Sequence, residues 1–138
     1  MLKKEKLFEL AGRNPFAKYM GMELIEVEQG FAKGRVRLDR QLTNVYGGMH
    51  GGCAYALADT LAGIAAATYG SYVTTVNGTM NYLLPISDTS YVYCEAKVVR
   101  QGNSVGVYET VIKNDAGELL CNGTFTYYKL KMPMEEKD

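Results

Sequence analysis

The feature that most constrains this chain is a stretch of small and apolar residues from Cys53 to Ala67, interrupted by a single charged side chain, Asp59. This composition predicts a helix that is apolar on most of its circumference and therefore buried on most sides. The stretch is too short, too rich in glycine and too acidic at its middle to span a bilayer. A carboxylate in such a helix costs free energy unless it is paired or used. Asp59 is therefore the first candidate for a functional residue.

Length and composition limit the possible classes of protein. A chain of 138 residues holds one hydrophobic core, so residues 1–138 are predicted to form a single domain. Fifteen basic and fifteen acidic side chains cancel, which leaves no basic field for nucleic-acid binding. Three cysteines, an odd number, indicate reduced thiols rather than a disulfide framework. Residues 1–10 lack the long apolar core of a signal peptide, and we expect a cytoplasmic protein with no membrane partner.

Changes in hydrophobic period divide the rest of the chain into elements. Residues 2–11 are predicted to form a short amphipathic helix that Gly12 and Pro15 end. From Met22 the period is two, with a turn at Gly30, and this pattern predicts a hairpin with one solvated face. After the long helix, the segments that read as strands are residues 72–84, 91–100, 105–113 and 119–130. The mostly charged tail from about 131 to 138 is predicted to be disordered.

These elements predict an α+β fold, in which an antiparallel sheet carries its helices on one face. A helix that is apolar nearly all round needs further cover on its remaining sides. Either the sheet curls around the helix, or a second subunit covers it.

A glycine-rich turn runs directly into the long helix, from Asn44 through Gly47 to His50-Gly51-Gly52. The backbone N–H groups of Gly51 and Gly52 have no intrahelical partner and point along the helix axis. A developing oxyanion is stabilised there, because the partial positive charge of the terminus and the free donors add. A cation is unfavourable at this end, so His50 is expected to be a neutral hydrogen-bonding imidazole. A purely capping or core role for His50 is the alternative.

The spacing between Asp59 and the start of the helix decides how the two could act together. Asp59 lies about two and a half turns along the helix, roughly 12 Å from its start. One small group cannot touch both. If both act on one carbonyl, Asp59 must come from a second, antiparallel copy of the helix, so the spacing predicts a dimeric site. The alternative is a structural carboxylate bonded to Thr60 or to a threonine of a strand.

This pattern resembles the signature of the hotdog-fold thioesterases of the phenylacetic-acid-degradation (PaaI-like) group. The resemblance continues through residues 75–85, 98–102 and 115–119 and covers about residues 20–128. It implies a hotdog fold, with an antiparallel sheet wrapped around a long central helix. It also implies homodimers, often paired into homotetramers, with sites at the dimer interface. The matching residues are Asn44, Gly47, His50-Gly51-Gly52, Leu57-Ala58-Asp59-Thr60, Gly63 and Ala65.

The same resemblance implies roles for individual residues. The Gly51 N–H would polarise the thioester carbonyl, and Asp59 of the partner chain would act as general base or nucleophile toward it. Asn44 and His50 would orient substrate, water or the leaving sulfur, and Thr75 would hydrogen-bond the water or the carboxylate. The further predicted substrate contacts are Gly52, Asn77 and Arg100.

One departure from the family pattern concerns the phosphates of coenzyme A. Relatives often carry another basic residue directly after the glycine at position 102, where this chain has Asn103 and Ser104. Arg100 is the basic residue that remains nearby.

The favoured function is hydrolysis of acyl-coenzyme A thioesters, either aryl types such as phenylacetyl-coenzyme A or medium and long acyl chains. No cofactor is expected, and no metal, because one histidine and three scattered cysteines match no familiar metal spacing. Two alternatives stay open. One is a hydratase or dehydratase of the same fold, which the order of His50 before Asp59 disfavours. The other is a non-catalytic acyl-coenzyme A-binding module.

Overall fold

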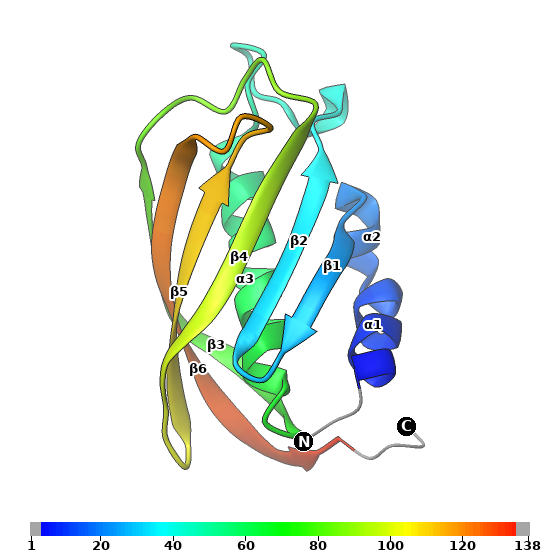
Figure 1. Cartoon of the computed structure of the whole chain (residues 1–138), viewed down its shortest axis with the longest axis vertical. Helices are drawn as coiled ribbons and strands as arrows, with labels where there is room; N and C mark the ends of the chain where they lie inside the picture. Colours follow the sequence, from blue (N-terminus) through cyan, green and yellow to red (C-terminus); the bar gives the residue numbers. More distant parts are fainter. Residues whose placement is uncertain (1–3, 135–138) are drawn as a thin grey trace.

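The computed structural model describes residues 4–134, in which a six-stranded antiparallel sheet curves around one long helix (Figure 1). The strand order is β1-β2-β4-β5-β6-β3. The predicted α+β architecture, with a sheet around a central helix, is confirmed. The strands are β1 (Glu23–Glu28), β2 (Phe31–Arg37), β3 (Ser71–Tyr82), β4 (Tyr91–Gln101), β5 (Val105–Lys113) and β6 (Leu119–Pro133).

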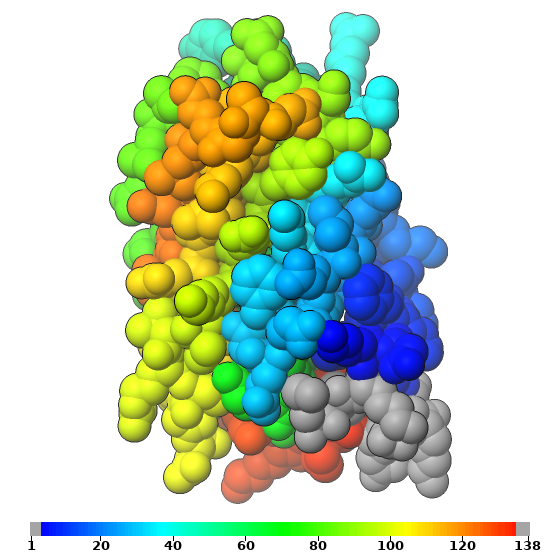
Figure 2. Space-filling view, in the orientation of Figure 1, coloured from blue at the N-terminus to red at the C-terminus, as the bar shows by residue number. Residues whose placement is uncertain are grey.

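The long helix α3 (Gly51–Ala67) packs against the inner face of the sheet, and the side chains of the sheet largely hide it in Figure 2. Its sheet-facing residues are mostly alanines, which let the sheet approach closely. At Gly34 of β2, a Cβ atom would lie 2.9 Å from the carbonyl oxygen of Glu23 and 3.0 Å from the Leu61 side chain, so the contact requires glycine. The fully buried residues of this face are Ala54, Leu57, Ala58, Leu61, Ala62 and Ala65.

Two short helices precede the sheet, α1 (Lys4–Arg13) and α2 (Pro15–Met20). The prediction that the first helix spans residues 2–11 is wrong at its end, because α1 continues through Gly12 to Arg13. Residues 2 and 3 lie outside the described residues. Asn14 ends α1 by capping α2, since its side-chain oxygen accepts the N–H groups of Phe16 and Ala17 at 3.1 Å each. No helix within residues 4–134 is long and apolar enough to cross a membrane.

The prediction of a disordered tail from residue 131 is wrong as far as residue 134. Strand β6 continues to Pro133, which pairs with Ser71 of β3. The backbone N–H of Met134 donates to the carbonyl of Gly70 at 3.1 Å, and its side chain is buried against Leu7 of α1. This pairing and burial outweigh the charge that suggested disorder. Residues 135–138 of the predicted tail lie outside the described residues.

Strand β3 forms one edge of the sheet. It pairs with β6 along one side, and no described residue pairs with its other side. Its 12 residues include no proline and no charged side chain. Proteins usually protect an edge strand with charges, prolines or a short length. A strand without such protection is suited to pairing with another chain.

Candidate active site

Asp59 is held by hydroxyl groups from two neighbouring strands. Its Oδ1 atom accepts hydrogen bonds from Thr75 Oγ1 at 2.8 Å and from Tyr127 Oη at 2.7 Å. Tyr127 Oη also lies 2.6 Å from the backbone oxygen of Asp59. Thr75 and Tyr127 are direct cross-strand partners on β3 and β6. The carboxylate is thereby fixed in orientation, while its Oδ2 atom accepts no hydrogen bond from any residue that the structure describes.

A bulge in β3 explains why Thr75 reaches the helix. The pairing of β3 with β6 shifts between Thr75 and Asn77, so Val76 is an extra residue in the strand. Gly78 faces inward, because a Cβ atom there would meet Tyr55 and Phe125. The bulge lets Thr75 face inward as well. Asn77 alternates to the outer face and is exposed, away from Asp59.

The environment of Tyr127 keeps its hydroxyl protonated. Burial raises the pKa of Tyr127, and the neighbouring Asp59 carboxylate raises this pKa further. At neutral pH the side chain is therefore a hydrogen-bond donor to the carboxylate. The sequence alone gave no reason to select Tyr127 from eleven tyrosines. Only its position opposite Thr75 in the sheet distinguishes Tyr127 from the other tyrosines, and that position depends on the strand register.

A cavity of about 350 Å³ opens beside this cluster, between α1 and α3. Among residues 4–134, Asp59 is the only charged side chain in its wall, and most of the other side chains are apolar. The lining residues are Leu7, Leu10, Ala11, Asn14, Asp59, Thr60, Gly63, Ile64, Ala67, Tyr72, Val73, Thr75, Tyr127 and Met134.

His50 caps the start of α3. Its Nδ1 atom accepts the N–H of Gly52 at 2.8 Å. The proton of the neutral ring is therefore on Nε2, and the expectation of a neutral, hydrogen-bonding His50 fits this geometry. The capping also corrects one expectation, because the Gly52 N–H is engaged by the imidazole. The Gly51 N–H has no acceptor among residues 4–134, so one donor, not two, stays free at the helix start.

A second cavity of about 520 Å³ lies in front of Gly51 and includes Asn44 in its wall. Asn44 Oδ1 accepts the N–H of Tyr46 at 2.9 Å, which closes the glycine-rich turn. Tyr82, at the end of β3, donates from its hydroxyl to the carbonyl of Gly51 at 2.7 Å. Segments 44–51 and 82–87 together form this cavity.

The predicted residues thus fall into two groups within one chain. Asp59 and Thr75 line the first cavity, and Asn44 and Gly51 line the second, with His50 next to Gly51. Asn77 and Arg100 line neither cavity. In the described part of the chain, no three His, Cys, Asp or Glu side chains are grouped so as to hold a metal ion.

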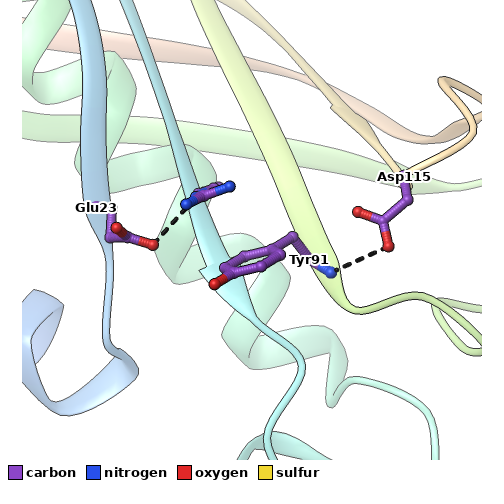
Figure 3. A network of polar contacts seen from close by, with 4 residues as sticks. Glu23, Tyr91 and Asp115 are labelled. Atoms are coloured by element: carbon purple, nitrogen blue, oxygen red, sulfur yellow. Dashed lines mark hydrogen bonds and ion pairs between the residues drawn. The ribbon is translucent and has the colours of Figure 1, made fainter.

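A separate polar network lies on the outer face of the sheet and has a structural role (Figure 3). The Arg35 guanidinium lies 4.0 Å from the centre of the Tyr91 ring, and its Nε donates to Glu23 at 3.0 Å. Asp115 accepts the backbone N–H groups of Ser90 at 2.7 Å and Tyr91 at 3.4 Å. The hydrogen bond from Ser90 lowers the pKa of Asp115. This carboxylate ties the β5–β6 turn to the start of β4.

Several known proteins are similar to this chain in sequence and in fold. Residues 46–121 match the model of a family described as the thioesterase superfamily. The acyl-coenzyme A thioesterase PaaI of Escherichia coli is 31% identical over 98 residues, which cover 71% of this chain and 70% of PaaI. The solved structure of the E. coli PaaI protein from the phenylacetic acid degradation operon superposes with a TM-score of 0.87 at 24% identity, covering 92% of each chain.

A further solved structure, smu.793 from Streptococcus mutans bound to acetyl-coenzyme A, superposes with a TM-score of 0.78 at 20% identity. The match covers 82% of this chain and 91% of that one.

Proposed function

Because the chain belongs to the thioesterase superfamily and is a thioester hydrolase with the hotdog fold, we propose that its substrates are acyl-coenzyme A thioesters. PaaI of E. coli, to which the chain is similar, is an acyl-coenzyme A thioesterase. The observation that carries the proposal is the Asp59 carboxylate. Thr75 and Tyr127 hold it through Oδ1, and no donor among residues 4–134 reaches Oδ2. A carboxylate fixed in this way is suited to act as a base or a nucleophile.

In the proposed reaction, the Gly51 N–H donates to the carbonyl oxygen of the thioester and stabilises the oxyanion as it develops. Asp59 of the partner takes a proton from water, whose oxygen bonds to the carbonyl carbon. The C–S bond then breaks, and the thiolate of coenzyme A takes up a proton as the acid is released. Alternatively, an Asp59 oxygen bonds to the carbonyl carbon, the C–S bond breaks to release the thiolate, and water then hydrolyses the resulting anhydride to the free acid and Asp59. General-base assistance contributes about 10² to 10⁴ in rate, and one oxyanion donor about 10² to 10³.

Other polar groups complete this assignment. The Nε2–H of His50 and the side chain of Asn44 orient the substrate, the water or the leaving sulfur. Gly52, Asn77 and Arg100 stay predicted substrate contacts, although Asn77 and Arg100 lie outside both cavities.

The unpaired edge of β3 supports a dimeric site. Strand β3 is tied to Asp59 through Thr75, in its first half, and to Gly51 through Tyr82, its last residue. We propose that two β3 strands pair antiparallel about a two-fold axis at Thr79. In this register, Tyr82 of one chain lies opposite the bulge beside Thr75 of the other. The free amide of each chain then approaches the carboxylate of its partner.

The proposal also includes association of two such dimers into a homotetramer and a cytoplasmic location. Cys53, Cys94 and Cys121 are free thiols, which fits a reducing compartment.

The catalytic assignment is tested by deleting the Gly51 N–H without disturbing the helix. Gly51 is the first residue of α3, where proline is well tolerated, and His50 has φ −60° and ψ 134°, a conformation suited to the residue before proline. Gly51→Pro removes the donor, whereas Gly51→Ala keeps it. We expect kcat/KM for acyl-coenzyme A, followed by thiol release, to fall by about 10² to 10³ in Gly51→Pro relative to Gly51→Ala. Equal rates in the two variants would contradict the assignment.

The same assay distinguishes the alternative functions. Binding of acyl-coenzyme A without turnover of any thioester would indicate a binding module. Addition of water to an enoyl-coenzyme A would indicate a hydratase.

The proposed dimer is tested at its two-fold axis. Thr79→Lys places two like charges directly opposite each other and should weaken the dimer, most strongly at low salt. Thr124→Lys is the matched control, because Thr124 pairs with Thr79 from β6 and lies one strand away from the edge. Sedimentation should show dissociation and parallel loss of activity only in Thr79→Lys. An active monomer would refute the shared site.

A further inference from the structure

The peptide group between Gly51 and Gly52 is held at both of its polar ends by side chains. Its carbonyl oxygen accepts the Tyr82 hydroxyl at 2.7 Å, and its N–H donates to Nδ1 of His50 at 2.8 Å. Tyr82 is the last residue of the edge strand β3, whereas His50 directly precedes α3. One peptide at the helix start therefore links a side chain of the sheet to the single histidine of the sequence.

Both hydrogen bonds have a fixed direction. A carbonyl oxygen only accepts, so the Tyr82 hydroxyl is the donor, and a backbone N–H only donates, so Nδ1 of His50 is the acceptor. Burial raises the pKa of Tyr82, which keeps its hydroxyl protonated at neutral pH. The first bond also strengthens the second, because a peptide whose oxygen accepts a hydrogen bond donates more strongly from its nitrogen. The neutral imidazole is left with its proton on Nε2, from which it can donate to a substrate.

The two glycines explain why this peptide needs support from side chains. A peptide between two glycines has no Cβ atom on either side, so it loses more conformational freedom in a helix than any other peptide. Gly52 also leaves room for the imidazole, because a Cβ atom there would lie 3.0 Å from Nδ1 and 3.2 Å from Cε1 of His50. A Cβ atom at Gly51 would lie 3.4 Å from the Tyr82 ring. The backbone of the two glycines therefore fits closely between the two side chains.

We propose that Tyr82 is a positioning residue, which acts through the Gly51–Gly52 peptide to hold His50 as a neutral Nε2–H donor for the substrate. The inference rests on the proposed function, in which His50 orients the reacting groups, and it adds the residue that orients His50. In this role the Tyr82 hydroxyl contacts the peptide and not the reacting atoms. The edge strand thereby determines which nitrogen of the imidazole carries the proton.

The first test is Tyr82→Phe, which removes the hydroxyl and keeps the ring that lines the second cavity. Because His50 is the single histidine, its ring-nitrogen NMR resonances identify the protonated nitrogen without ambiguity. The hydrogen bond from the Gly52 N–H to Nδ1 should give a nitrogen–nitrogen coupling in the wild type. In Tyr82→Phe we expect this coupling to decrease and part of His50 to carry its proton on Nδ1. We also expect kcat/KM for acyl-coenzyme A to fall by about two- to tenfold.

Tyr108→Phe is the control, because the Tyr108 hydroxyl donates to Gln101 and not to the helix start. It should keep the wild-type coupling and the wild-type kcat/KM. Gly52→Ala reaches the imidazole from the other side, since the added Cβ atom displaces Nδ1. It should also decrease the coupling. Because both substitutions act on one peptide, Tyr82→Phe should lower kcat/KM less in the Gly52→Ala background than in the wild type.

The NMR and kinetic results separate this proposal from the proposed function. If Tyr82→Phe keeps the wild-type coupling and tautomer, or keeps the wild-type kcat/KM, the positioning role is overturned and the proposed hydrolysis still stands. If Tyr82→Phe does not fold, the wild type and Gly52→Ala decide. A wild type with the His50 proton on Nδ1, or a Gly52→Ala variant with an unchanged coupling, would overturn the proposal. If the wild-type protein releases no thiol from any acyl-coenzyme A, the proposed function and the role of Tyr82 in it are both overturned.

Discussion

Removal of the Tyr127 hydroxyl tests how the structure positions Asp59. The Tyr127→Phe substitution deletes one oxygen and keeps the ring, which is 3% exposed and packs edge-on against Tyr108 with ring centroids 6.0 Å apart. The single proton of this hydroxyl is shared between two acceptors of Asp59, Oδ1 at 2.7 Å and the backbone oxygen at 2.6 Å, and the substitution removes it from both. Thr75 still donates to Oδ1 at 2.8 Å. The carboxylate therefore stays in place but is held by one strand instead of two.

The expected decrease in kcat/KM of Tyr127→Phe follows from these contacts. A hydrogen bond to a charged group contributes about 1.5–3 kcal/mol. Because Thr75 remains, we take the lower end, about 1.5 kcal/mol, which corresponds to roughly a tenfold decrease in kcat/KM. Adding Thr75→Val removes the last donor to Oδ1. The decrease in transition-state stabilisation in the double variant should therefore exceed the sum of the decreases in the two single variants.

Tyr108→Phe is the matched control. Tyr108 is also buried, and its hydroxyl donates to Gln101 at 2.5 Å without contacting Asp59. Both variants should lose about 1 kcal/mol of stability in urea denaturation. Only Tyr127→Phe should lower the rate of thiol release. If the two variants have the same kcat/KM, Tyr127 contributes to stability alone and the reasoning is refuted.

Three further predictions concern single groups. Asp59→Asn should lower kcat by about 10² to 10⁴ in the thiol-release assay with little change in KM, and a rate near that of the wild type would exclude Asp59 as the base. The lowered pKa of Asp115 means that its carboxylate stabilises the fold above the ordinary carboxyl pKa, and that this contribution is lost as pH falls through the lowered value. Urea midpoints should therefore fall on acidification less steeply in Asp115→Asn than in the wild type. Burial raises the pKa of Cys121 to about 11 and raises that of the less buried Cys53, so a thiol reagent should modify Cys53 first and Cys121 only after unfolding.

The elements that the sequence predicted well are those whose signal is local. Alternation of side chains predicted the β1–β2 hairpin, and the strand predicted over residues 105–113 is β5. The errors fall where distant contacts decide the outcome. The C-terminal segment is ordered as far as Met134 because that side chain packs against Leu7, at the other end of the chain. No local pattern contains that contact.

The candidate site was predictable to the same extent. The turn from Asn44 to Gly51 is contiguous in the sequence, and it forms one wall of one cavity. The position of Tyr127 depends on the register of β6 against β3 and on a bulge, neither of which the sequence specifies. The capping of Gly52 by His50 likewise depends on a side-chain rotation. The sequence could therefore identify the carboxylate and, through the family resemblance, its partner Thr75, but not the second donor, Tyr127.

The dimensions of α3 support the proposal that the edge strand contributes to the site. A helix rises about 1.5 Å per residue, so no movement of loops within one chain brings the Gly51 N–H to the Asp59 carboxylate. A second chain can do so, and β3 contacts both residues, because Tyr82 donates to the Gly51 carbonyl and Thr75 donates to the Asp59 carboxylate. The strand that would form the subunit contact is thus also the strand that fixes the reacting groups. Weakening this edge should accordingly reduce the number of active sites, while the kcat of the dimers that remain stays unchanged.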